Sequence, residues 1–103
     1  MALPDLTPEQ RAQALEKATR ARRRRAEVKA ALKSREMALS EVLALADTDE
    51  AIAKMKVVAL LESLPRVGAN TAAILMDEIG IAASRRVRGL GPVQREELVR
   101  RFG

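Results

Sequence analysis

The sequence of 103 residues has no histidine, no cysteine, no tryptophan and no tyrosine, and it has one phenylalanine. Without cysteine the chain can form neither a disulfide nor a thiol nucleophile, and without histidine it lacks the commonest metal ligand and general base. Sequence-tolerant binding of single-stranded nucleic acid usually relies on aromatic stacking platforms, so the shortage of aromatic residues disfavours that class of protein as well.

Long apolar runs are also missing. No stretch approaches the roughly 20 apolar residues that a membrane-spanning helix needs. The opening residues Met-Ala-Leu-Pro-Asp lack the charged and apolar regions of a signal peptide. The sequence therefore predicts a cytoplasmic protein with no membrane partner.

Catalytic constellations are absent from the pattern of residues. The pairs Asp77-Glu78 and Glu96-Glu97 fall on predicted helices, where neighbouring side chains point about 100° apart and do not converge on a substrate. The serines have no histidine to act as a base, and no phosphate-loop or dinucleotide fingerprint occurs. We expect a protein that is not an enzyme and that has no catalytic residue, no cofactor and no metal.

Positive charge is what the chain has in excess, with 19 Lys and Arg against 14 Asp and Glu and a pI near 10.4. Residues 1–36 carry ten basic and five acidic side chains, residues 37–63 two and five, and residues 64–103 seven and four. A basic protein of this kind favours a polyanionic partner, and the uneven distribution predicts two basic surfaces separated by an acidic segment.

The remaining signals predict an all-α fold of about five helices, because the apolar residues are mostly Ala, Leu, Val and Ile. Thr7 caps a first helix, Pro8 suits its first position and Gln10 completes a capping box. This helix continues to about Lys33. Its apolar stripe is mostly alanine, so we expect it to lean on the rest through its C-terminal half and to project into solvent around residues 20–25.

Four further helices follow in the predicted order. A short helix covers Met37 to Leu45, and a central core helix starts at Asp47, which forms a capping pair with Glu50, and runs to about Ser63. The next helix begins at Gly68, and Gly80 ends it; its buried stripe is Ala72, Leu75, Met76 and Ile79. Pro92 opens the last helix, whose predicted apolar face is Val93, Leu98, Val99 and Phe102.

Two segments after the central helix are candidate phosphate sites. Pro65 stops that helix and a tight hairpin leads to Gly68, where the amides of a new helix start attract anions. The predicted contacts there are Arg66, Gly68, Asn70 and Thr71. A basic loop then carries Arg85, Arg86, Arg88 and Gly89. The alternatives are a plain helical connection at the hairpin and, in the loop, arginines paired with Asp77 or Glu78.

A second contact surface for a nucleic acid is predicted on the first helix, at Arg20, Arg22, Arg23 and Arg24. Arginine outnumbers lysine there, and its planar fork suits phosphate oxygens, guanine edges and a narrow minor groove. The alternative for this cluster is an exposed helix face, balanced by Glu16 and Glu27 at helical spacing.

The hairpin and loop carry a family resemblance. Leu64-Pro65-x-Val67-Gly68-x-x-Thr71-Ala72 resembles the phosphate-binding hairpin of helix-hairpin-helix modules, with Arg66 where those usually carry a second Gly. Residues 64–91 look like the helix-two-turns-helix element shared by formamidopyrimidine-DNA glycosylases and a small-subunit ribosomal protein.

Over its whole length the chain resembles the integration host factor family of actinobacteria, including mycobacteria and streptomycetes. The resemblance is carried by Met1-Ala2-Leu3-Pro4, Lys54-Met55-Lys56-Val57, Arg85-Arg86-Val87-Arg88-Gly89-Leu90-Gly91 and Phe102. It implies a nucleoid-associated architectural protein that binds duplex DNA through phosphates and the minor groove, bends or bridges it, and influences chromosome topology. Assistance to site-specific recombination, with phage integrase or a topoisomerase as a partner, is implied as well.

We therefore expect a monomer with two parts: a long, partly projecting helix over residues 1–36 and a compact DNA-binding domain over residues 37–103. The helix-two-turns-helix-like element would occupy residues 51–103. Because the same module occurs in a ribosomal protein, binding to structured RNA or the ribosome is the alternative. A helical protein-interaction module with arginines that serve only solubility is a third reading.

Overall fold

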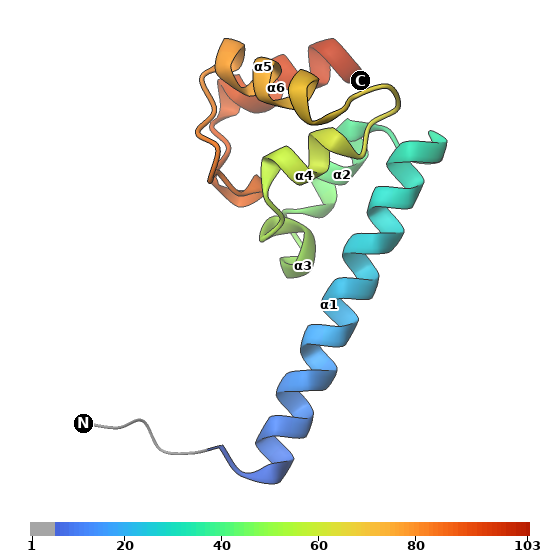
Figure 1. The fold of residues 1–103 in the computed structure, drawn as a ribbon, viewed down its shortest axis with the longest axis vertical. Coiled ribbons are helices and arrows are strands. Elements are labelled where there is room, and N and C mark those ends of the chain that lie inside the picture. The colour runs from blue at the N-terminus through green and yellow to red at the C-terminus, as the bar shows by residue number, and fades with distance from the viewer. Residues whose placement is uncertain (1–5) are drawn as a thin grey trace, which may run out of the picture.

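The computed structural model describes residues 6–103, and one long helix dominates its shape (Figure 1). This helix, α1 (Pro8–Ser34), is followed in chain order by five shorter α-helices and one 3-10 turn within the described residues. They are α2 (Leu39–Leu45), α3 (Glu50–Ala53), α4 (Val57–Glu62), α5 (Ala69–Ile79), the turn η1 (Val87–Gly89) and α6 (Pro92–Phe102). The predicted all-α class is confirmed. The resemblance noted at residues 1–4 lies outside the described residues.

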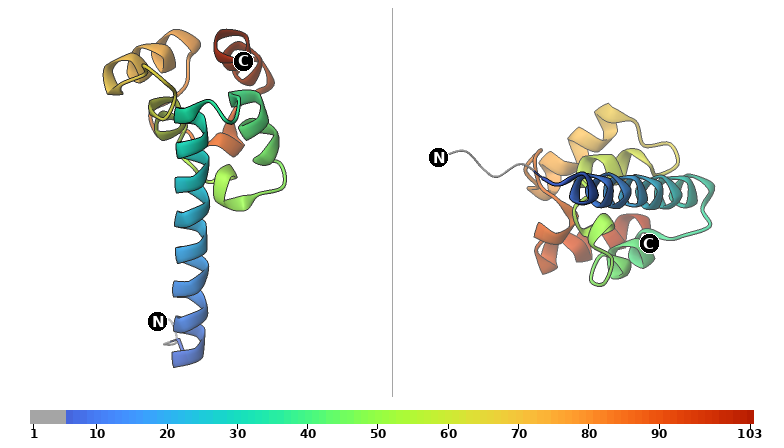
Figure 2. Two further views of the ribbon diagram at one scale, coloured as in Figure 1. Left: turned by 90° about the vertical axis from the view of Figure 1, so that its right-hand side faces the viewer. Right: turned by 90° about the horizontal axis from the view of Figure 1, so that it is seen from below.

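Helix α1 begins as its sequence predicts. The Thr7 hydroxyl accepts from the Gln10 amide at 3.1 Å, and the Gln10 side chain accepts from the Thr7 amide at 2.9 Å. The helix ends at Arg35, whose φ of 66° is left-handed. Between these ends, residues 6–18 are all exposed, whereas Val28 and Leu32 are buried. Figure 1 and the left view of Figure 2 show the N-terminal half standing clear of the other helices.

Helix α1 contacts the core through its C-terminal half, as predicted, but its projecting part lies closer to the N-terminus than residues 20–25. Arg24 and Arg25 are half-buried, and α1 packs against α3 at this level. The prediction was wrong because it weighed only apolar side chains as anchors. The Arg24 guanidinium donates to the Asp49 carboxylate at 2.8 Å, and this ion pair joins α1 to the start of α3.

The predicted single helix from Asp47 to about Ser63 is also wrong, because it is two helices, α3 and α4. Asp49, not Asp47, caps the first of them and accepts from the Ala51 amide at 3.0 Å. Between the two, the backbone pairs with a distant segment: Val87 donates to Met55 and Val57 donates to Arg85, each at 2.9 Å. This short antiparallel pairing, centred on Lys56 and Arg86, takes residues 54–56 out of helical geometry.

Helix α5 follows its prediction closely. Ala72 and Met76 are buried, Leu75 and Ile79 pack against the core, and Gly80 ends the helix with a left-handed φ of 81°. In α6, Pro92 occupies the first turn and Leu98 is buried, but Val93 is 77% exposed. The placement of Val93 on the apolar face was wrong, because it lies five residues before Leu98 and so roughly 140° around the helix.

One cluster of apolar side chains forms the core, with contributions from every helix. Its fully buried large members are Leu32, Leu39, Ile52, Leu60, Leu61, Leu98, Val28, Val42 and Val57. Because α1 supplies two of these side chains, the end of α1 is part of the same core as residues 37–103. The division into parts at residue 36 stays a prediction.

Candidate nucleic-acid interface

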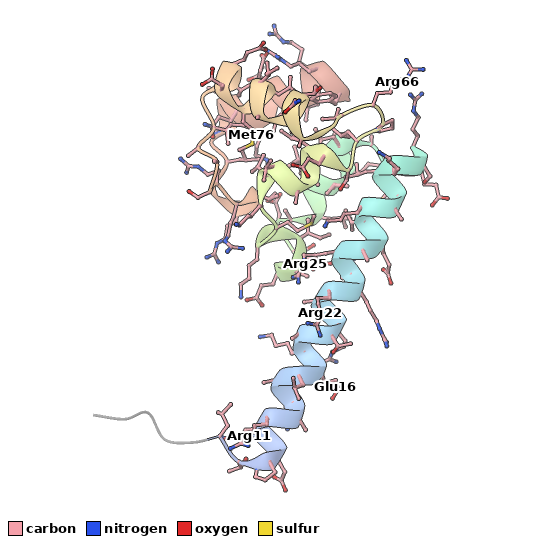
Figure 3. All side chains as sticks on the ribbon, viewed as in Figure 1. Arg11, Glu16, Arg22, Arg25, Arg66 and Met76 are labelled. Atoms are coloured by element: carbon pink, nitrogen blue, oxygen red, sulfur yellow. The ribbon has the colours of Figure 1, made fainter. Side chains whose placement is uncertain are left out.

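The hairpin between α4 and α5 is held by its apolar residues and exposes its arginine. Leu64 and Val67 are buried, and the Val67 amide donates to the Leu64 carbonyl at 3.2 Å. Arg66 lies between them with a left-handed φ of 65°. Related hairpins usually carry glycine here, and the positive φ explains why. The Arg66 side chain points away from the body of the molecule at the edge of the hairpin (Figure 3).

The start of α5 leaves its backbone donors open. Gly68 is the capping residue and offers no side-chain acceptor, and the first turn carries no acidic residue. No hydrogen bond to the amides of residues 68–71 occurs in the described part of the chain. A Cβ added at Gly68 would meet nothing within 4 Å. Unpaired amides at an exposed helix start form a site for a phosphate or another anion.

The basic loop around η1 differs from the hairpin because its backbone is already bonded. The pairing with Met55 and Val57 fixes one side of the loop, and Val87 and Leu90 bury their side chains in the core. Within the loop, the Arg85 guanidinium donates to the Gly89 carbonyl at 3.0 Å. A Cβ on Gly89 would lie 3.0 Å from Arg85 Cδ, so glycine lets this arginine fold across the loop.

The arginines of this loop are not neutralised by carboxylates. Arg86 donates to the Lys54 carbonyl, and neither Arg86 nor Arg85 or Arg88 forms an ion pair within residues 6–103. The alternative pairing with Glu78 is not present, because Glu78 pairs with Arg101 at 2.8 Å. The loop therefore presents uncompensated positive charge on a fixed backbone.

The arginines of α1 do not form one uniform surface. The Arg24 side chain pairs with Asp49 and, at 3.3 Å, with Glu27. The hydrogen bond from Arg24 lowers the pKa of the Asp49 carboxyl, and the bond to Asp49 raises the pKa of Arg24. Arg24 is thus a positioning residue. Arg22 and Arg23 are exposed, with no ion pair in the described chain, and Arg20 lines a shallow hollow beside Asp49 and Glu50.

The structure keeps the hairpin and the basic loop apart. The hairpin lies at the start of α5, whose 11 residues span roughly 16 Å. The basic loop lies beyond the other end of α5, beside the junction of α3 and α4 (Figure 1). A group of cations near the loop was not predicted from the sequence; it consists of Arg25, Lys29, Lys54 and Lys56. The Lys54-Met55-Lys56 run was noted only for its family resemblance. The contribution of Arg25 and Lys29 depends on the packing of α1, which no local pattern indicates.

Comparison with known proteins decides the family. A family model described as the S13-like H2TH domain matches residues 32–102. The protein named integration host factor in Streptomyces coelicolor is 58% identical over 103 residues, which is 100% of this chain and 96% of that protein. Its namesake in Mycobacterium tuberculosis is 56% identical, with 100% and 98% covered. The chain belongs to the actinobacterial integration host factor family.

A solved structure agrees with this assignment. The structure of sIHF bound to an 8bp palindromic DNA matches with a TM-score of 0.83 and 53% identity. The match covers 85% of this chain and 99% of that chain. The family resemblance and the helix-two-turns-helix character predicted from the sequence are thereby confirmed.

Two further features concern residues 6–103. No helix there is long and apolar enough to cross a membrane. No group of three or more His, Cys, Asp or Glu side chains there is arranged to hold a metal ion.

Proposed function

We propose that this chain is an architectural, nucleoid-associated protein that binds duplex DNA through backbone phosphates and the minor groove. The observation that carries the proposal is the pairing of two open sites on one helix, α5. Its start offers amides that are free within residues 6–103, beside Arg66, and the loop after it offers Arg85, Arg86 and Arg88, which have no carboxylate partner within the same residues. Asn70, Thr71 and Gly89 complete the proposed contacts.

The two sites suit different parts of a duplex. Helix-start amides bind phosphate oxygens and fix the register of the protein on DNA, but they carry no sequence information. Arginines on a rigid loop can enter the minor groove, where the negative potential is strongest when the groove is narrow. Contacts of this kind favour a protein that shapes DNA over one that reads a long sequence. Influence on chromosome topology and assistance to recombination follow as roles in the nucleoid.

We assign no catalytic role. The carboxylates that could have formed an acid-base pair are on the surface, and Glu97 is engaged by Arg100 and Arg101 at 2.7 and 2.9 Å. Those arginines lower the pKa of the Glu97 carboxyl, the opposite of what a general acid at neutral pH needs. Binding to structured RNA is the less favoured function, since the related solved structure contains DNA.

A gel-shift comparison tests the proposal. Labelled duplex DNA, a structured RNA hairpin of equal charge and single-stranded DNA would be titrated with the protein at one fixed salt concentration. We expect the duplex DNA to bind most tightly, with an affinity that falls steeply as salt is raised. Preferential binding to the RNA hairpin, or no shift of duplex DNA at low salt, would contradict it.

A further inference from the structure

A basic hollow lies between α1, the junction of α3 with α4, and the basic loop. Its volume is about 370 Å³, and five of its seven lining residues are cations: Arg25 and Lys29 from α1, Lys54 and Lys56 from the junction, and Arg86 from the loop. The other two are apolar, so no carboxylate lines it. Residues 37–63 contain only two basic side chains, and both line this hollow.

The charges in the basic hollow are largely uncompensated. Lys54 pairs with Glu50 at 2.6 Å, and Arg86 donates to the Lys54 carbonyl. Arg25, Lys29 and Lys56 make no ion pair within residues 6–103. Like charges held close together destabilise a fold unless solvent or a bound anion offsets their repulsion.

The three segments that carry the cations are fixed against one another. The pairing of Lys56 with Arg86 fixes the junction against the loop. The contact of Arg24 with Asp49 fixes α1 against α3, one residue before Arg25. Arg25 and Lys29 are four residues apart, and so they lie on one face of α1. The arrangement is thus set before any ligand arrives.

We infer that the basic hollow binds a backbone phosphate of the same duplex that the basic loop engages. The packed half of α1 then belongs to the primary DNA surface. Arg86 is the link, because it is part of both the loop and the hollow. Lysines act as point charges on flexible stems, so a site built mainly from them accepts a phosphate without reading sequence. The inference rests on the proposed function.

The basic hollow connects two basic surfaces that the charge distribution along the sequence predicted to be separate. The sequence predicted an acidic segment that separates the α1 arginines from the basic loop. Asp49 and Glu50 line the neighbouring hollow and not the basic hollow, and Arg25 and Lys54 line both. Lys29, Lys56 and Arg86 line only the basic hollow, which connects α1 to the loop. On this flank, α1 and the loop form one continuous basic surface.

The test uses the full chain and a short duplex. The variant Arg25→Gln with Lys29→Gln removes two charges from the hollow. The control, Arg11→Gln with Lys17→Gln, removes the same net charge, one arginine and one lysine, from exposed positions of α1 that do not line the hollow. Glutamine keeps helix propensity close to that of arginine and lysine. Circular dichroism and melting temperature would verify that both variants are folded.

We expect the hollow variant to flatten the slope of log K against log salt by about 1 to 2 units, since each phosphate contact contributes roughly 0.9. The affinity should fall roughly five- to tenfold at moderate salt, and the control should stay near wild type. Equal slopes in the two variants would overturn the inference. Failure of the wild-type chain to bind duplex DNA would instead overturn the proposed function, and the inference with it.

A single substitution outside α1 tests the basic hollow independently of any effect on the folding of α1. Lys56→Gln leaves α1 unchanged. The Lys56 side chain is exposed and makes no capping hydrogen bond to α4, although Lys56 is the residue that precedes this helix. It should flatten the slope by about 0.9. An unchanged slope in this variant would also count against the basic hollow as a phosphate site.

Discussion

The two ends of α5 offer different groups to a nucleic acid. At the hairpin end, the backbone supplies the donors, because the amides of residues 68–71 have no acceptor in the described chain and only Arg66 adds charge. At the loop end, the backbone is bonded to Met55 and Val57, and the donors are guanidinium groups. The hairpin should therefore tolerate side-chain changes that add no charge, whereas the loop depends on its side chains.

A rigid helix connects the hairpin to the segment that leads to the basic loop. Helix α5 begins after Gly68 and ends at the left-handed Gly80, and its Ala72 and Met76 side chains are buried. The separation of the two sites is set by this packed helix and by the pairing of the loop with Met55 and Val57, and not by a flexible linker. A duplex that contacts both sites must match that spacing, and a mismatch would be relieved by bending the DNA.

The largest expected effect comes from removing the charge at the loop end. Replacement of Arg85, Arg86 and Arg88 together by Ala should lower duplex affinity roughly a hundredfold or more, because two or three phosphate contacts are lost. The slope of log K against log salt should flatten by about 2 to 3 units, while the helical circular dichroism spectrum is retained. Fluorescence anisotropy over a salt series would measure both quantities.

Arg88→Ala is the internal control for that triple change. Arg85 and Arg86 also donate to backbone carbonyls, whereas Arg88 contacts no protein acceptor in the described chain. The single variant should lose about one unit of slope with no change in melting temperature. If the triple variant kept the wild-type slope, the loop would not be a DNA contact.

The hairpin end is tested by adding a negative charge at Gly68, a change that removes no side-chain contact. Gly68→Asp places a carboxylate beside the free amides, where it should stabilise α5 as a good capping residue and at the same time repel a phosphate. We expect roughly tenfold weaker DNA binding with an equal or higher melting temperature. Because a Cβ at this position meets nothing within 4 Å, Gly68→Ala is a clean control and should bind nearly as wild type. Weak binding by both variants would mean that close approach, not charge, is what the site requires.

Arg66→Gly should have a smaller effect, with opposite consequences for stability and binding. Glycine relieves the left-handed backbone at φ 65°, although it also loosens the unfolded chain, so we expect a net gain of about 0.5 kcal/mol in the free energy of unfolding. Duplex affinity should fall about two- to fivefold, with about 0.9 units less salt slope. Urea titration and anisotropy would separate the two effects. A loss of stability would show that the Arg66 side chain contributes more than charge.

Local chemistry explains which features could be predicted from the sequence. The capping box of Thr7 and Gln10, the left-handed Gly80 and the placement of Pro92 depend on a few neighbouring residues, and each was predicted correctly. The hairpin before α5 and the basic loop after it could be located in the sequence for the same reason. A glycine before a helical stripe and a dense arginine run are both visible in the linear order of residues.

Features that depend on distant contacts were missed. The break at residues 54–56 requires the backbone of residues 85–87, some 30 positions later. Nothing in the apolar periodicity of the central segment signals that partner. The same holds for the packing of α1, which uses the long-range pair of Arg24 and Asp49 in place of a broad apolar stripe. The basic hollow depends on both the break at residues 54–56 and the packing of α1, so the sequence could not predict it.

The smallest expected effect on a short duplex lies outside both ends of α5, on the exposed part of the α1 arginine cluster. Because Arg24 is engaged by Asp49 and Arg20 lines a hollow with carboxylates, the predicted second DNA surface is reduced to Arg22 and Arg23. Arg23 precedes Arg25 by two residues and so points roughly 200° around the helix, away from the basic hollow. A variant with Arg22→Gln and Arg23→Gln should bind a short duplex within about twofold of wild type, since the contacts at α5 are intact. It should nevertheless lose compaction of plasmid DNA, because a second segment of DNA can be held only by charge that the first segment does not cover. Atomic-force imaging at matched binding occupancy would decide, and compaction equal to that of wild type would identify these two arginines as a solvated helix face.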